Sequence, residues 1–134
     1  MYNDSINSKE ILMSAITVGT TTAKSAVIDI SDCFKVSLAF RASTLAGTFV
    51  KIEKIFAYKS KDGSGTAVEF ASADDFILPL AKMSVASTSA VGKNGLRQCQ
   101  NIYNSIEIGF ISDAGANTVQ LTVIKEGLKN EPKA

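Results

Sequence analysis

The sequence predicts an all-β protein, an antiparallel β-sandwich of jelly-roll-like type with roughly seven to nine short strands. In several separate segments, apolar residues alternate with polar ones at the two-residue period of a half-buried strand. Clusters of Gly, Asp, Asn and Ser separate these segments at intervals of about eight to twelve residues, and no segment shows a long helical period. At 134 residues, the chain is large enough to bury a core without disulfide or metal staples.

The N-terminal part predicts a polar arm followed by two strands. Residues 1–10 are polar and show no period, so we expect a flexible arm there. A first edge strand is expected over Leu12–Val18, and a second strand over Thr22–Ile30. The predicted inward residues of the second strand are Ala26, Ile28 and Ile30. One domain is then expected over residues 11–127, with a polar tail over 128–134.

The segment Phe34–Ala42 predicts a strand with one wet face. Its sequence, FKVSLAFRA, alternates strictly between apolar and polar or small residues. The following segment Thr48–Tyr58 fits two structures, because Phe49, Ile52 and Phe56 also occur at helical spacing. We favour a strand with a bulge near Lys54, since β-branched and aromatic residues dominate the segment, and we keep the helix as the alternative.

A second hairpin and weaker strands follow. The Asp-Gly step in Lys59–Gly65 predicts a turn, after which Thr66–Ala71 returns with Val68 and Phe70 inward. Lys82–Val91 predicts a weak or exposed strand, and Gly92–Gly95 predicts a loop.

The segment Ser105–Lys125 carries the clearest pattern and predicts a closing β-hairpin. The residues expected on its inner face are Ile106, Ile108, Phe110, Val119, Leu121 and Val123. Pairing Ile111 with Thr118 satisfies both strands in one register and leaves Ser112–Asn117 as the loop.

The outer face of this predicted hairpin is a candidate contact surface, covered either by another part of the chain or by another subunit. The residues expected on it are Glu107, Gly109, Ile111, Gln120 and Ile124. Two aliphatic side chains on an outer face suggest a covered surface, and a glycine in a strand suggests that something approaches it closely.

The composition argues against catalysis and metal binding. The chain contains no histidine, which removes the commonest general base and metal ligand. The adjacent carboxylates Asp74 and Asp75 would point to opposite faces of a strand and are interpreted as turn residues. Cys33 and Cys99 are interpreted as buried thiols, although pairing stays open. We therefore expect no enzyme, no catalytic or metal-binding residues, no cofactor and no small-molecule ligand.

Charge and hydropathy exclude two further classes of partner. The net charge is +1, and the lysines are scattered along the chain, which argues against a nucleic-acid surface. No apolar run reaches the roughly 18 residues of a membrane span. The N-terminus lacks the pattern of a signal peptide, so a protein made and kept in a cytoplasm is expected.

Two stretches resemble small virion proteins of tailed bacteriophages, in particular the β-sandwich head decoration or auxiliary proteins. They are SAVIDISDCFKVSLAFRAS, residues Ser25–Ser43, and YNSIEIGFISDAGANTVQLTVIKEG, residues Tyr103–Gly127. The resemblance implies a non-enzymatic component of the virion that binds copies of itself and the major capsid protein. It assigns no binding residue, because the shared elements are general β patterns.

The alternative is a carbohydrate-binding or receptor-binding sandwich from a phage tail or fibre. Such modules present exposed aromatic platforms to their ligands. The chain has no Trp and offers Tyr2, Tyr58 and Tyr103 for that role.

Overall fold

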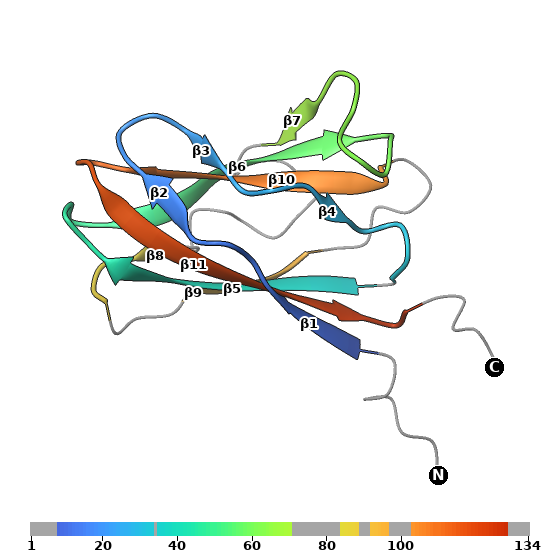
Figure 1. The fold of residues 1–134 in the computed structure, drawn as a ribbon, viewed down its shortest axis with the longest axis horizontal. Coiled ribbons are helices and arrows are strands. Elements are labelled where there is room, and N and C mark those ends of the chain that lie inside the picture. The colour runs from blue at the N-terminus through green and yellow to red at the C-terminus, as the bar shows by residue number, and fades with distance from the viewer. Residues whose placement is uncertain (1–7, 34, 71–83, 89–91, 97–102, 129–134) are drawn as a thin grey trace, which may run out of the picture.

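Eleven strand segments form two antiparallel sheets in the computed structural model, which describes residues 8–33, 35–70, 84–88, 92–96 and 103–128. The two sheets stack as the layers of a β-sandwich (Figure 1), and no helix occurs in these ranges. Sheet A contains β1 (Ser8–Leu12), β2 (Ile16–Val18), β5 (Lys35–Thr44), β9 (Gly92–Leu96) and β11 (Asn117–Glu126). Sheet B contains β3 (Ala23–Lys24), β4 (Ile28–Asp29), β6 (Val50–Tyr58), β7 (Val68–Phe70), β8 (Ser84–Val85) and β10 (Ser105–Ser112). The predicted fold class is confirmed.

Broken edges explain why there are more segments than the sequence predicts. Sheet A has the order β1-β11-β5-β9, and β2 follows β1 along the same side of β11. Sheet B has the order β3-β10-β6-β7, with β4 beside β3 on β10 and β8 beside β7 on β6. Each pair of short segments therefore occupies the place of one interrupted strand.

The core lies between the two sheets. β5 and β11 contribute alternating buried residues from sheet A, whereas most residues of β6 and β10 in sheet B are buried. The Phe40 and Phe110 rings meet across the layers edge to face, with their centroids 5.1 Å apart. Burying each such large apolar side chain contributes roughly 1.5–3 kcal/mol. The inward residues predicted for β5, β10 and β11 are all buried, Phe34 excepted because it lies outside the described residues.

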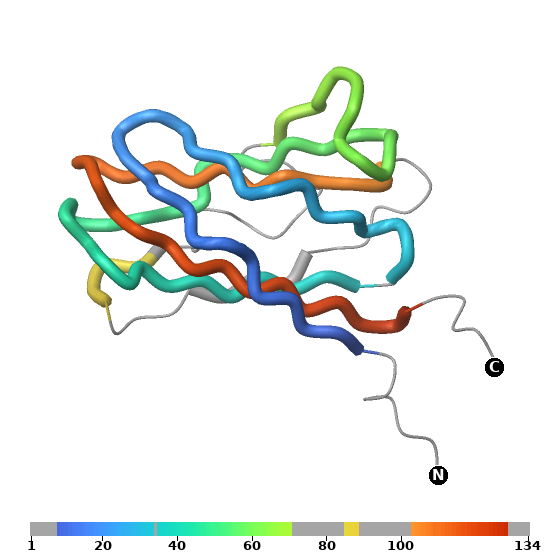
Figure 2. Tube along the Cα trace, viewed as in Figure 1, coloured from blue at the N-terminus to red at the C-terminus, as the bar shows by residue number. Residues whose placement is uncertain are grey.

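The predicted closing hairpin is wrong, although its strands and inner faces are right. β10 pairs with β3, β4 and β6, whereas β11 pairs with β1, β2 and β5, so the two strands belong to different sheets. Figure 2 shows the chain leaving the end of β10 and crossing into the other layer to begin β11. The apolar residues of the two strands therefore face each other across the core rather than lying side by side on one sheet. The short connection 113–116 is a link between sheets.

A buried amide holds that link in place. Asn117 is fully buried, and its side-chain nitrogen donates to the carbonyls of Val18 (2.9 Å) and Ala114 (2.7 Å). Its side-chain oxygen accepts from the backbone N–H groups of Ala46 (2.7 Å) and Gly47 (3.0 Å). One side chain thus satisfies backbone groups from three separate connections at this end of the sandwich.

The other strand predictions have mixed outcomes. Thr48–Tyr58 is confirmed as a strand with a bulge, because the register against β10 shifts between Ile52 and Lys54 and leaves Glu53 unpaired. The hairpin of β6 and β7 is confirmed, but Val68 is exposed rather than inward. The loop predicted at Gly92–Gly95 is wrong, because that segment forms β9 and pairs with β5.

The N-terminal predictions need smaller corrections. β1 begins at Ser8, so the last residues assigned to the arm pair with β11, while residues 1–7 lie outside the described residues. The strand predicted over Thr22–Ile30 is interrupted, with Ile28 buried but Ala26 exposed. Asp74, Asp75 and Cys99 lie outside the described residues, and Cys33 is buried. No helix capable of crossing a membrane is found in the described ranges.

Candidate interaction faces

The outer face of sheet B carries a charge and aromatic network centred on Glu107. The Tyr58 hydroxyl donates to a Glu107 carboxylate oxygen over 2.5 Å, and the Lys24 Nζ lies 3.6 Å from the same oxygen. The Glu107 side chain is 16% exposed, and Tyr58 is 7% exposed. The hydrogen bond to Glu107, with burial as the second cause, raises the pKa of Tyr58 to about 12.

Phe56 covers the middle of this face. Its ring packs over Gly109, where an added Cβ would come within 2.9 Å of both the Phe56 ring and the Thr22 methyl group and 3.2 Å from the Lys54 carbonyl. The Lys24 Nζ lies 4.3 Å from the Phe56 ring centroid, within the range of a cation–π contact. The close approach that the sequence predicted at Gly109 therefore comes from the chain's own side chains.

Further charged side chains on the outer face of sheet B are paired at its rim. The Lys54 Nζ lies 2.9 Å from a Glu69 carboxylate oxygen, and this hydrogen bond is the main cause that raises the pKa of Lys54. The Thr22 hydroxyl donates to Glu53, the bulged residue of β6. The charged groups of this outer face are thus largely paired with one another.

The outer face of sheet A is different, because small and polar side chains cover it. The paired rows of β1, β11 and β5 place Leu12 beside Thr122 and Ala39, and the next row places Glu10 beside Ile124 and Ser37. No described strand or loop lies over this face. Leu12 is 71% exposed, the largest exposure of any large hydrophobic side chain in the described ranges.

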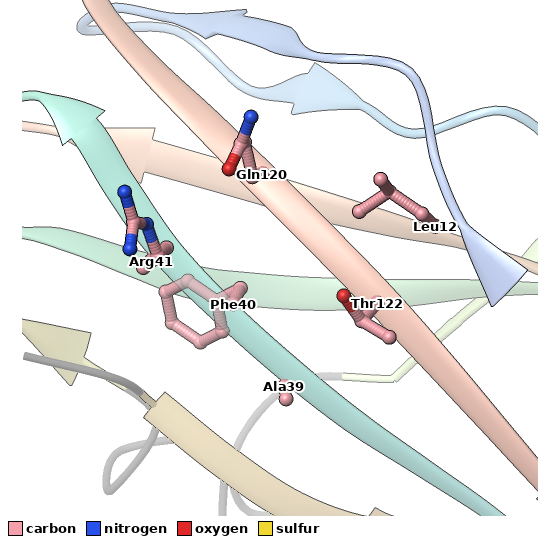
Figure 3. A pocket seen from close by; sticks show the side chains of 6 residues that line it. All are labelled: Leu12, Ala39, Phe40, Arg41, Gln120 and Thr122. Carbon is pink, nitrogen blue, oxygen red and sulfur yellow. The ribbon is translucent and has the colours of Figure 1, made fainter. Parts of the chain in front are cut away.

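A shallow groove of about 100 Å³ crosses this face beside Leu12. Figure 3 shows the side chains that line it, which come from β1, β5 and β11. They are Leu12, Ala39, Phe40, Arg41, Gln120 and Thr122. Phe40 is itself buried in the core, whereas Arg41 and Gln120 are exposed at one end of the groove.

The charges on the outer face of sheet A remain partly unpaired. Lys35 and Glu126 approach to 3.7 Å at the far end of the face. Arg41 and Glu10 are both exposed and form no ion pair or hydrogen bond within the described part of the chain. Among the side chains that the structure describes on this face, Arg41 and Glu10 are thus one free positive and one free negative group, on either side of the row that contains Leu12.

The five predicted contact residues do not form one surface. Glu107, Gly109 and Ile111 lie on the outer face of sheet B, whereas Gln120 and Ile124 lie on the outer face of sheet A. Gln120 is exposed, but Glu107 and Gly109 take part in the network that closes sheet B. The error follows from the predicted hairpin, which placed both strands in one sheet.

Sequence reasoning missed Leu12 and Glu10 as surface residues. The signal that could have identified them is the pairing of β1 with β11, which no local pattern in the sequence reveals. The alternation in FKVSLAFRA correctly predicts that Arg41 lies on the solvent-facing side of its strand. Without the neighbouring strands, however, Arg41 alone suggests no site.

The two described tyrosines do not form the platform that carbohydrate binding would need. Tyr58 is buried, and Glu107 occupies its hydroxyl. Tyr103 is half-buried and contacts the Phe70 ring edge to face, with centroids 5.6 Å apart. Tyr2 lies outside the described residues, and no group of three or more His, Cys, Asp or Glu residues that could hold a metal occurs within them.

Comparison with known proteins gives architectural neighbours only. No protein-family model matches the chain, and no curated protein matches it. A subunit of the disulfide-linked pili that form Bacillus endospore appendages is similar at 18% identity, over 91% of this chain and 88% of that one, with a TM-score of 0.46. The SPBc2 prophage-derived protein YomS is similar at 12% identity, over 88% and 93%, with a TM-score of 0.48.

A carbohydrate-binding module is also among the neighbours. The family 11 module of a Clostridium thermocellum cellulase is similar at 11% identity, over 93% of this chain and 86% of that one, with a TM-score of 0.41. At such identities and scores, none of these proteins indicates what the present chain binds or assembles with.

Proposed function

We propose that the chain is a non-enzymatic structural protein of a tailed-phage virion, a capsid decoration or auxiliary protein made in the host cytoplasm. Its partners are copies of itself and the major capsid protein. The viral setting comes from the sequence resemblance of Ser25–Ser43 and Tyr103–Gly127. The observation that carries the assembly role is the open outer face of sheet A, with its exposed Leu12 and unpaired Arg41 and Glu10.

Small side chains suit this face for contact with another regular surface. Ser37, Ala39 and Thr122 project little from the sheet, so a partner can approach the backbone closely. A symmetric shell repeats each contact many times, and many weak contacts then sum to stable attachment through high effective concentration. Such a role needs neither a cofactor nor a catalytic group.

A shell-binding experiment tests the proposal. The reading frames adjacent to the gene identify the candidate major capsid protein, and shells assembled from it are mixed with the purified chain and sedimented. We expect the chain to sediment with the shells. Ala39→Arg places a bulky charge in the centre of the sheet A face and should abolish co-sedimentation.

A matched control separates that effect from general charge. Thr66→Arg adds the same charge at an exposed residue in the connection between β6 and β7 and should sediment as the unchanged chain does. If the unchanged chain stays in the supernatant with every shell tested, the proposed function is wrong.

A further inference from the structure

The free charges of the sheet A face are arranged so that two copies of the face complement each other. Arg41 lies on β5, one row beyond Ala39, while Glu10 lies on β1, one row on the opposite side of Leu12. Thr122 on β11 stands midway between them, in the row that joins Leu12 to Ala39. The face is therefore positive at one corner and negative at the diagonally opposite corner.

A two-fold axis that passes over Thr122 brings Arg41 and Glu10 of the two copies together in two intermolecular ion pairs. The axis lies in the plane between two facing sheets and runs perpendicular to the line from Arg41 to Glu10. Rotation about it places Arg41 of each copy over Glu10 of the other, so both pairs form at once. The charges of Arg41 and Glu10 are then neutralised by a second copy.

The same rotation places the exposed leucine over the groove. With strands about 4.8 Å apart and a rise of about 3.4 Å per residue, Leu12 of one copy falls between Gln120 and Thr122 of the other. Both of these residues line the groove of about 100 Å³. A cavity of about 150 Å³ holds a benzene ring, which has six carbons. The groove of about 100 Å³ is therefore of a size for a leucine side chain, which has four.

We propose that the outer face of sheet A is an isologous docking surface for a second copy of this chain, held by reciprocal Arg41–Glu10 ion pairs and by reciprocal insertion of Leu12 into the groove. The inference rests on the proposed function and names the partner of the same face. We favour a second copy as the partner because Arg41 has its complement in Glu10 and Leu12 has its complement in the groove, all on this one face.

The affinity of such a dimer is modest. The paired rows cover three strands and a few residues along each, so the footprint is at the small end of specific interfaces. We expect a dissociation constant of roughly 10 μM to 1 mM for the isolated chain. On a shell, multivalency raises the effective strength of the same contact.

Sedimentation equilibrium of the purified chain, with charge reversal at both positions, tests the docking mode. Arg41→Glu and Glu10→Arg should each raise the dimer dissociation constant about tenfold, because each replaces two attractions by two repulsions. The double variant R41E/E10R restores both pairs in reverse and should return to within about threefold of the unchanged chain. Leu12→Ser should weaken the dimer about tenfold.

Two controls accompany the series. Lys61→Glu makes the same charge change outside the sheet A face and should leave the dissociation constant unchanged. Urea melts of the charge variants should match that of the unchanged chain at low protein concentration, since Arg41 and Glu10 are exposed.

The outcomes separate this inference from the proposed function. A chain that binds shells but stays monomeric alone up to about 1 mM overturns the docking mode and leaves the function standing. A chain that dimerises as expected but never binds shells overturns the function instead. A dimer that ignores both charge reversals, or a monomer whose groove takes up an oligosaccharide, also overturns the docking mode.

Discussion

The two outer faces of the sandwich differ in how their polar side chains are paired. On sheet B, Tyr58, Lys24 and Glu107 bond to one another, and Phe56 lies buried above Gly109 although it points away from the core. On sheet A, the centre of the outer face holds the small residues Ala39 and Thr122, and Arg41 and Glu10 find no partner within the described part of the chain. The difference indicates that the outer face of sheet B contributes to the stability of the fold, and it is the reason for proposing that the outer face of sheet A contacts other molecules.

The contrast depends on side-chain size at neighbouring positions. Gly109 leaves space for the Phe56 ring to lie flat on the backbone, and the long side chains of Lys24 and Lys54 then reach across it. The corresponding centre of sheet A holds Ala39 and Thr122, which are too short to cover each other. A substitution should therefore cost folding stability on sheet B and association on sheet A.

The largest effect expected on either outer face comes from filling the space at Gly109. Gly109→Val adds atoms where a Cβ would already approach the Phe56 ring and Thr22 to 2.9 Å, so we expect a loss of about 2–3 kcal/mol in the free energy of unfolding. The matched change Thr122→Val on the outer face of sheet A should stay within about 0.5 kcal/mol. Urea melts of both variants provide the measurement, and equal losses would contradict the contrast.

The next effect is the loss of the Tyr58 hydroxyl. Tyr58→Phe removes a 2.5 Å hydrogen bond to a carboxylate that is mostly buried, so we expect a loss of roughly 1–2 kcal/mol. A double-mutant cycle with Glu107→Gln isolates the contact, and the two losses should not add. Full additivity would mean that the two side chains do not stabilise each other.

The same contact makes stability depend on pH in the alkaline range. The pKa of Tyr58 is raised to about 12 in the folded chain, whereas an unfolded tyrosine titrates near a pKa of about 10. The unfolded state therefore releases this proton first, and the stabilisation present below about pH 10 is lost as pH rises toward about 12. Urea melts across this range should show a steeper decline for the unchanged chain than for Tyr58→Phe, and parallel declines would contradict the shifted pKa.

The sequence predicts inward faces well and neighbours poorly. Alternation at Ile106, Ile108 and Phe110 shows which side of β10 faces the core, because the strand period alone determines it. It does not show whether β10 and β11 share a sheet, since apolar residues meet equally well side by side or across a core. A connection as short as Asp113–Ala116 is typical of a hairpin. Here the contacts of Asn117 with three connections hold it as a crossing instead.

The candidate site could be predicted only in part for the same reason. Gln120 and Ile124 were assigned correctly to an outer face, because that needs only the period of β11. Leu12 and Glu10 join that face through pairing with residues more than 100 positions away in the chain. No local pattern encodes such a partner, so the sequence alone does not show that Glu10 lies on the same face as Arg41.

A smaller effect is expected at the rim of sheet B. Lys54→Ala removes the pair with Glu69, but the carboxylate is half exposed, so solvent screens the interaction and we expect a smaller loss in the free energy of unfolding than for Tyr58→Phe. Added salt should reduce the difference from the unchanged chain further. A loss as large as that of Gly109→Val would show that the rim, rather than the packing of Phe56, holds the face closed.

The smallest effect on folding should come from Leu12, the residue that we propose inserts into the groove of a second copy. Leu12 is 71% exposed, so Leu12→Ser should change the free energy of unfolding by less than about 0.5 kcal/mol in the dilute monomer. Leu121, fully buried on the neighbouring strand, is the matched control, and Leu121→Ala should cost about 2–5 kcal/mol. Urea melts at low concentration and sedimentation at high concentration measure the two effects separately. A Leu12→Ser chain that melts early would place this side chain in the folding of the edge strand and remove the distinction between the two faces.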